Sequence, residues 1–157
     1  MDGDYLFVPV TSEADWSAYH EIRRTALFEA RGRFGVYQEA HPDEVDPHNH
    51  PCLLLHDGAP VGAIRVDLPA GTASAFFRRV AIAQERQRQG HGTLLMREAE
   101  AFAASQNRDL FVANVAPDAI PFYERLGYTL DANPTDNDPA NPRMIRKAPL
   151  RPIAILP

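Results

Sequence analysis

The sequence has little cysteine and no surplus of basic charge. Cys52 is the single cysteine among 157 residues, which excludes an internal disulfide and a zinc cluster built on thiolates. Sixteen basic residues stand against 21 acidic ones, so the formal net charge is −5. A general nucleic-acid-binding domain usually shows a strong basic excess. We therefore expect no nucleic-acid partner.

Long hydrophobic runs are also lacking. The apolar stretches fall far short of the roughly 20 residues that cross a bilayer as a helix. The first residues, Met1–Asp4, are acidic where a secretory signal peptide is basic. Both absences predict a soluble cytoplasmic protein without a membrane partner.

Neither internal repeats nor long low-complexity tracts interrupt the chain. Its length is typical of one domain, so we expect a single domain over residues 1–157. Proline is absent from residues 70–116 and frequent in the C-terminal part, residues 132–157. Since proline interrupts helices and central strands, the proline-free stretch should hold the longest regular elements.

Hydrophobic periodicity predicts an alternation of strands and helices. Strands are expected at residues 5–10, 52–56, 61–66, 75–82, 110–113, 128–130 and 144–147, and helices at about 12–30, 90–106 and after 118. Residues 31–51 show no period and predict a long loop with room for one short helical turn. Antiparallel hairpins followed by a strand–helix–strand crossover indicate an α+β or mixed α/β fold.

The most informative segment joins a strand to a long helix through a basic turn that contains glycine. Backbone N–H groups in the first turn of a helix are free, and the helix dipole is positive there. Gly90 and Gly92 carry no side chain, so a phosphate can approach the main chain. Arg86 and Arg88 add positive charge. The turn therefore predicts an anion site suited to pyrophosphate.

Two common phosphate-binding loops do not fit this turn. A Walker loop needs lysine where Thr93 follows Gly92, and a dinucleotide fingerprint needs a small residue where Leu95 stands. The pattern Gln87-x-x-Gly90-x-Gly92 instead resembles the acyl-CoA loop of the GNAT acyltransferase superfamily. The alternative is an ordinary strand-to-helix turn in which glycine only adds backbone flexibility.

A second motif strengthens this resemblance. Residues 119–128 are similar to the family's C-terminal helix, in which a small residue is followed four positions later by tyrosine, here Tyr123, and then by an aromatic residue after glycine. The resemblance covers about residues 61–128. It implies a GNAT-like fold with a central mixed, mostly antiparallel sheet of about six or seven strands, flanked by about four helices.

The resemblance also implies a function. Family members move an acyl group, usually acetyl, from acetyl-CoA as co-substrate to a small-molecule or peptide amine. Tyr123 occupies the general-acid position and would protonate the departing CoA thiolate, because a phenol with a pKa of about 10 keeps its proton at neutral pH. The alternative for Tyr123 is a half-buried aromatic on an amphipathic helix. A main-chain N–H at Val80 or Ile82 would stabilise the tetrahedral oxyanion.

The cofactor-binding residues follow from the same resemblance. The Gly90 turn would hold the pyrophosphate, and the preceding strand would pair with the pantetheine arm as an added strand does. Asn114 is included although the family's asparagine position falls at Ala116. The predicted set is Val80, Ala81, Ile82, Gln87, Arg88, Gln89, Gly90, His91, Gly92, Thr93, Asn114 and Phe122.

The acceptor side is less specified by the sequence. Many family members place a carboxylate base in or beside the central strand, but residues 75–82 contain none. The amine proton could pass to a water chain or to one of four side chains, Glu29, Glu39, His41 or His50. The end of the first helix and the loop 31–51 are expected to contact the acceptor through Glu29, Arg33, Tyr37 and His50.

Two alternatives to an enzyme of this kind remain open at this point. A non-catalytic acyl-CoA-binding sensor could have the same fold. A metal-dependent protein could use His41, His48 and His50 with the acids between them. We favour a polar surface loop and no metal, because no ligand pair falls on a predicted rigid element. A homodimer, common in the family, is a further expectation.

Three local predictions concern charge and reactivity. Arg78 and Arg79 should point to opposite faces of their strand. Cys52 should be inert in the core. A solvated edge strand, protected by charge against pairing, is predicted at the C-terminus from Arg143, Arg146, Lys147 and Arg151.

Overall fold

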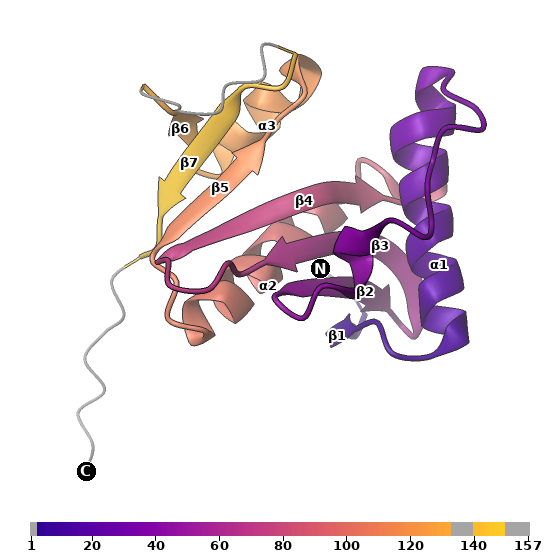
Figure 1. The fold of residues 1–157 in the computed structure, drawn as a ribbon. Helices are drawn as coiled ribbons and strands as arrows, with labels where there is room; N and C mark the ends of the chain where they lie inside the picture. Colours follow the sequence, from indigo (N-terminus) through magenta and orange to yellow (C-terminus); the bar gives the residue numbers. More distant parts are fainter. Residues whose placement is uncertain (1–2, 133–139, 150–157) are drawn as a thin grey trace.

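A computed structural model describes residues 3–132 and 140–149 of the chain. In this part, seven strands form one sheet in the order β1-β2-β3-β4-β5-β7-β6 (Figure 1). They are β1 (Tyr5–Pro9), β2 (Asn49–His56), β3 (Ala59–Asp67), β4 (Ser74–Ile82), β5 (Leu110–Asn114), β6 (Thr129–Leu130) and β7 (Arg143–Lys147). Every pairing is antiparallel except that of β4 with β5. The predicted mixed, mostly antiparallel sheet is confirmed.

The described residues contain three α-helices rather than about four: α1 (Glu13–Arg23), α2 (His91–Ser105) and α3 (Ile120–Arg125). The predicted first helix continues beyond α1 as a π-helical turn, Arg24–Phe28, and a 3₁₀ turn, Glu29–Arg31. The short helical turn foreseen in the long loop is the 3₁₀ segment Pro42–Val45. The loop is shorter than predicted, because β2 begins at Asn49.

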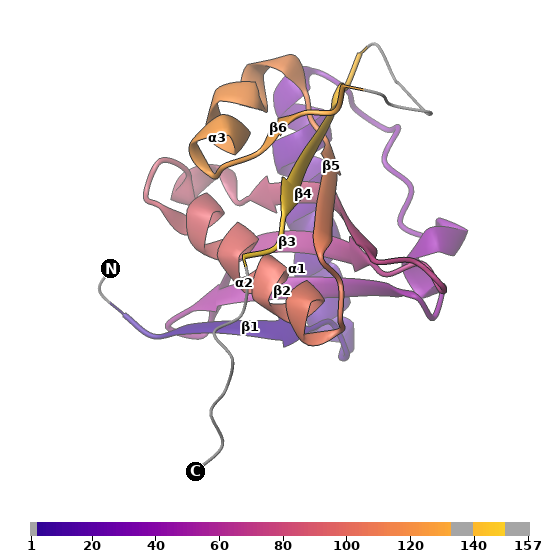
Figure 2. The same ribbon diagram turned by 90° about the vertical axis from the view of Figure 1, so that its left-hand side faces the viewer.

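The helices cover opposite faces of the sheet. α1 packs Tyr19 and Ile22 against Leu53 of β2, and α2 buries Leu95 and Met96 on the other face. Figure 2 shows α2 and α3 on one side of the sheet and α1 on the far side. Among the described residues, no helix has the length and apolar character needed to traverse a bilayer.

The sheet splits between β4 and β5. The two strands pair only from Ser74 to Phe77 of β4, and the remainder of β4 has no assigned partner on β5. Figure 1 shows them diverging toward α1. One part of the molecule therefore consists of β1–β4 with α1 and α2, and the other of β5–β7 with α3. The split leaves an open strand edge inside the sheet, where an extended ligand can add.

The C-terminal strand is not the solvated edge that its charges predicted. β7 lies between β5 and β6, and its Met144 is fully buried. Arg146 donates to Glu100 of α2 at 3.0 Å, and the guanidinium of Arg143 lies 5.7 Å from the ring of Phe76. The prediction was wrong because these charges make tertiary contacts that a single strand does not reveal. The fourth residue of that prediction, Arg151, lies outside the described residues.

Candidate active site

A cleft of about 1720 Å³ opens where the sheet splits. It extends from the face covered by α2 to the face covered by α1, with the free part of β4 between them. We call one part the α2 end, lined by residues from the turn 84–93 and from α3. The other part is the α1 end, lined by residues from the segments 23–44 and 77–79.

The turn before α2 presents bare main chain to the cleft. Gly90 adopts a φ of +87° immediately before the helix, and Arg88 is also left-handed at +64°. The Leu94 N–H donates to the Gly90 carbonyl at 3.3 Å, so the amides of residues 91–93 precede the first helical hydrogen bond. No described side chain caps them. Three free donors at the positive end of a 15-residue helix favour an anion.

Gly92 joins this turn to α3. A Cβ atom on Gly92 would lie only 3.3 Å from Cζ of Phe122. The ring of Phe122 in turn makes an edge contact with Tyr123, with centroids 5.3 Å apart. The imidazole of the neighbouring His91 is buried and lies 3.0 Å from the Tyr5 hydroxyl. His91 can therefore contribute to the predicted cofactor site only through its main chain.

β4 carries a bulge beside the split. Between the pairs Ala63↔Ala81 and Arg65↔Arg78, β4 has two residues, Arg79 and Val80, where β3 has one. Arg79 has a φ of +55°. Neither Arg79 nor Val80 has an assigned partner on β3 or β5. The bulge interrupts the ladder and re-aims the chain where the cleft begins.

The bulge includes Arg79, one member of the arginine pair. Arg78 and Arg79 both line the cleft. Strict alternation holds only where the pleat is regular, and one extra residue breaks it. The predicted pantetheine-binding residues Val80, Ala81 and Ile82 line the same cleft.

Tyr123 lies on α3 and lines the cleft. Its side chain is almost fully buried, in edge contact with Phe122 and Tyr128. The hydroxyl makes no hydrogen bond to any residue that the structure describes. Burial raises the pKa of Tyr123, so the phenol keeps its proton well above neutral pH. The site thus holds a protonated hydroxyl that has no partner among the described residues.

Asn114 lines the cleft, but its side chain is already engaged. Its Oδ1 accepts from Nη1 of Arg78 at 3.1 Å, and its Nδ2 donates to the Asn141 carbonyl at 3.3 Å. The amide therefore links β4, β5 and the segment before β7 across the base of the split.

The structure brings two of the four predicted acceptor residues to the cleft. Arg33 and Tyr37 line the α1 end, and the Tyr37 hydroxyl lies 2.6 Å from Nδ1 of His20. Glu29 and His50 are not among the lining residues. Glu29 faces Arg24 at 3.4 Å instead, and the His50 imidazole packs on Phe102 of α2, with centroids 5.3 Å apart.

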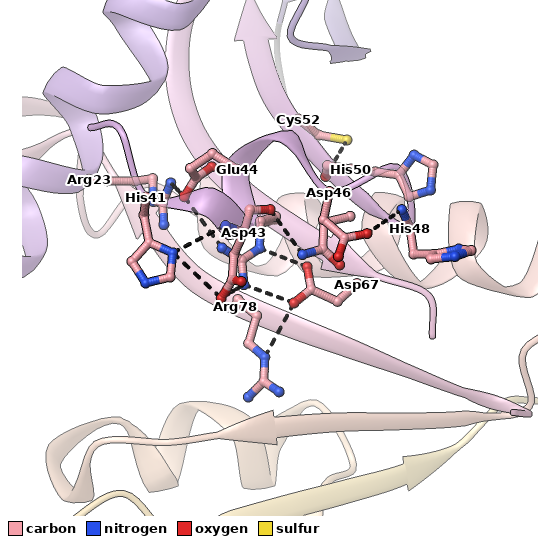
Figure 3. Close-up of polar contacts among 12 residues, drawn as sticks. Arg23, His41, Asp43, Glu44, Asp46, His48, His50, Cys52, Asp67 and Arg78 are labelled. Carbon is pink, nitrogen blue, oxygen red and sulfur yellow. Dashed lines mark hydrogen bonds and ion pairs between the residues drawn. The ribbon is translucent and has the colours of Figure 1, made fainter. Parts of the chain in front are cut away.

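A buried ionic network supports the α1 end (Figure 3). Glu44, in the 3₁₀ segment, accepts from Nη1 of Arg23 at 2.6 Å and from the Tyr19 hydroxyl at 2.9 Å. Arg65 contacts Glu44 at 3.4 Å and donates twice to Asp67, at 2.7 and 2.9 Å. Burial alone would raise the pKa of Glu44, but the charge and hydrogen bond of Arg23 and the hydroxyl of Tyr19 hold it below its usual value.

Sequence reasoning missed this network. The available signal was Arg65, a charge in the middle of an otherwise apolar strand, Val61–Val66. A buried arginine requires an acidic partner, but spacing alone did not show that Glu44 lies beside it.

The loop histidines do not converge on a metal site. Figure 3 shows His41 set apart from His48 and His50, and Nδ1 of His41 accepts from the Asp43 N–H at 3.2 Å. Over residues 3–132 and 140–149, no group of three or more histidine, cysteine or acidic side chains could hold a metal ion. Cys52 is buried, which raises the pKa of its thiol to about 12, as expected of an unreactive core residue.

The split sheet and the free amides at the start of α2 are features of the GNAT acetyltransferase fold. The sequence model of the Acetyltransferase (GNAT) family matches residues 13–128, and the chain belongs to this family. It is 30% identical over 122 residues to a candidate acetyltransferase of Bacillus subtilis (strain 168), covering 76% of this chain and 80% of that protein. The protein is accordingly an acyltransferase.

Solved structures share the fold at lower identity. An acyl-CoA N-acyltransferase from Pseudomonas aeruginosa superposes with a TM-score of 0.76 at 17% identity, over 92% of this chain and 99% of that one. The ribosomal-protein-S18-alanine N-acetyltransferase from Escherichia coli gives 0.71 at 15% identity, over 98% and 99%. An N-acetyltransferase from Thermoplasma acidophilum in complex with coenzyme A gives 0.70 at 16% identity, over 92% and 99%.

Proposed function

We propose that the protein transfers an acetyl group from acetyl-CoA to a primary amine by direct attack, with Tyr123 as general acid. The observation that carries the proposal is the protonated hydroxyl of Tyr123, which has no partner in the described part of the chain, in the same cleft as the free amides before α2. A donor held by those amides at one end would reach along β4 toward the phenol. The coenzyme A complex of the T. acidophilum enzyme, which has this fold, supports a CoA ester as the donor.

The α2 end supplies the donor site in this proposal. The main chain of residues 87–93 would bind the pyrophosphate, with Arg86 and Arg88 adding charge from the rim. The pantetheine arm would run along the free edge formed by residues 80–82. An N–H of this edge, at Val80 or Ile82, would donate to the thioester carbonyl and stabilise the oxyanion as it forms.

The reaction balances without a metal or redox partner. The neutral amine attacks the thioester carbonyl carbon, a C–N bond forms, and the carbonyl electrons move to oxygen. When the intermediate collapses, the C–S bond breaks and sulfur takes the proton of Tyr123. The attacking nitrogen loses its extra proton to a base or to solvent as the amide forms, and the phenolate regains a proton from solvent. Of the four side chains proposed as base, only His41 lines the cleft, and it is the first to test.

The test separates turnover from binding. Thiol release from acetyl-CoA should be measured against an amine panel, and calorimetry should measure the heat of coenzyme A binding. We expect both signals. Tight binding of coenzyme A with no turnover on any amine would favour the sensor alternative, and absence of binding would remove the assignment of the Gly90 turn. Cytoplasmic location and a homodimer stay predictions.

A further inference from the structure

The cleft is cationic although the protein is acidic. Among the described residues, ten arginines and three acidic residues line it, in a chain of formal net charge −5. Arg86 and Arg88 belong to the turn where we propose a diphosphate, and Arg125 lies on α3. The other seven lie away from that turn, so the donor phosphates do not account for them.

Several of these seven arginines are neutralised by a partner within the protein. Arg23 pairs with Glu44 at 2.6 Å. Arg31, on the rim, faces Asp118 at 3.2 Å. In each of these pairs the acidic partner offsets the arginine's charge and leaves little of it for a ligand.

Arg33 and Arg79 differ from the paired arginines. Neither side chain forms an ion pair or a hydrogen bond with any residue in the described part of the chain. Both guanidinium groups lie over the ring of Phe28, at 4.9 and 5.0 Å from its centroid. The ring attracts the two cations without using their N–H donors. Two arginines that share one ring and have no anionic partner among the described residues form a site that a carboxylate or phosphate fits.

Arg79 places this proposed anion site beside the strand edge where the acetyl transfer is proposed to occur. It is the bulge residue that directly precedes Val80, and it has a left-handed φ of +55°. That backbone conformation is unfavourable for a residue other than glycine and persists only where the surroundings impose it. An anion bound by Arg79 would lie next to the strand edge on which the thioester is proposed to rest.

We propose that the amine acceptor carries an anionic group, a carboxylate or a phosphate, which Arg33 and Arg79 bind while its amine faces the thioester. This inference rests on the proposed function and adds the class of acceptor. A polyamine would meet like charges in the same place and is disfavoured. Bidentate, charge-assisted hydrogen bonds from the two guanidinium groups would favour an anionic acceptor over other amines.

The first test uses matched amines that differ in charge. β-Alanine is compared with β-alaninamide, and O-phosphoethanolamine with ethanolamine, as acetyl acceptors. We expect kcat/KM to favour the anionic member of at least one pair by about tenfold or more, and the preferred pair identifies carboxylate or phosphate. Arg79→Gln and Arg33→Gln should bring that ratio toward one. Arg24→Gln, which removes an arginine outside the cleft, is the matched control and should keep it.

The second test does not need turnover. The Nε–Hε resonances of Arg33 and Arg79, assigned with the two glutamine variants, are followed while the coenzyme A-bound protein is titrated with each of the four amines. The proposal expects saturable shifts with an anionic amine and none with its neutral counterpart. Equal shifts with sodium chloride at the same ionic strength would overturn it. Measurable acetyl transfer without any preference for anionic amines would overturn it too, and would leave the proposed function intact.

Discussion

The two ends of the cleft use different kinds of chemical group, main-chain amides at one end and side chains at the other. At the α2 end, the anion site is formed by backbone amides on consecutive residues, and glycine keeps side chains away from it. At the α1 end, the groups are side chains brought together from α1, the 3₁₀ segment, β3 and β4. The first end should therefore tolerate loss of side chains but not their addition. The second end should show the opposite behaviour.

The largest expected effect comes from truncating the centre of the α1 end. Glu44→Ala leaves Arg23 and Arg65 buried with one acidic partner fewer. Breaking a buried ion pair from one side costs about 3–5 kcal/mol, which urea unfolding would measure. Glu39→Ala is the control, since Glu39 is 62% exposed and lies 3.6 Å from Arg24. We expect a change below about 1 kcal/mol there. Equal effects of the two variants would contradict the network's role.

Adding a side chain should damage the α2 end. In Gly92→Val, the new atoms press on Phe122 and displace the neighbouring Tyr123 from its position. Misplacement by about 1 Å can cost roughly 100-fold in rate, so we expect a loss of that order in kcat/KM and weaker coenzyme A binding by calorimetry. Ser105→Val at the exposed far end of α2 is the control. A fully active Gly92→Val enzyme would show that the close approach of α2 and α3 is dispensable.

Tyr123→Phe tests the proposed general acid that α3 contributes to the cleft. Removing the hydroxyl should lower kcat by about tenfold or more and leave the dissociation constant of coenzyme A nearly unchanged. Tyr128→Phe is the matched control, because Tyr128 donates to Glu100 at 2.7 Å outside the cleft and should affect stability rather than kcat. Burial raises the pKa of Tyr123 above its ordinary value of 10.0. Ionisation of this phenol should therefore not lower the rate at any pH below 10.0. An unchanged kcat would remove Tyr123 from the mechanism.

Acid should weaken the α1 end selectively. The pKa of Glu44 lies below its ordinary value of 4.5 in the folded protein. The ionised Glu44 therefore stabilises the folded protein. This stabilisation is fully present at pH values above 4.5 and is lost as the pH falls through the lower pKa of the folded state. A tenfold weaker affinity of the folded protein for this proton corresponds to about 1.4 kcal/mol of stability. Urea unfolding of the wild type and of Glu44→Gln should therefore converge as the solution is acidified, and a constant gap would contradict this account.

The smallest effect is expected from an exposed charge at the α2 end. Arg88→Gln removes a cation from the rim and leaves the main-chain donors in place. Exposed ionic contacts contribute about 0–1 kcal/mol, so coenzyme A affinity should fall by less than about fivefold, and less still at high salt. A loss as large as that of Gly92→Val would show that side chains, not amides, hold the phosphates.

The sequence by itself determined the elements and the α2 end. Alternating apolar residues and the glycines before α2 are local signals, because each depends on neighbours within a few residues. The predicted strands and long helices were found, with a π-helical turn, Arg24–Phe28, that no local pattern announced. Gly127, which follows the C-cap of α3, adopts a left-handed φ of +100°.

Only the tertiary structure decided the α1 end. The bulge at Arg79 overrode the strict alternation of β4, and pairing with β5 and β6 made β7 an interior strand. The contact of Glu44 with Arg23 and Arg65 joins residues 21 positions apart in each direction. A sequence shows that such charges exist, but burial decides which must pair, because only desolvated charges require a partner. That choice depends on how the layers pack, which no short stretch of sequence contains.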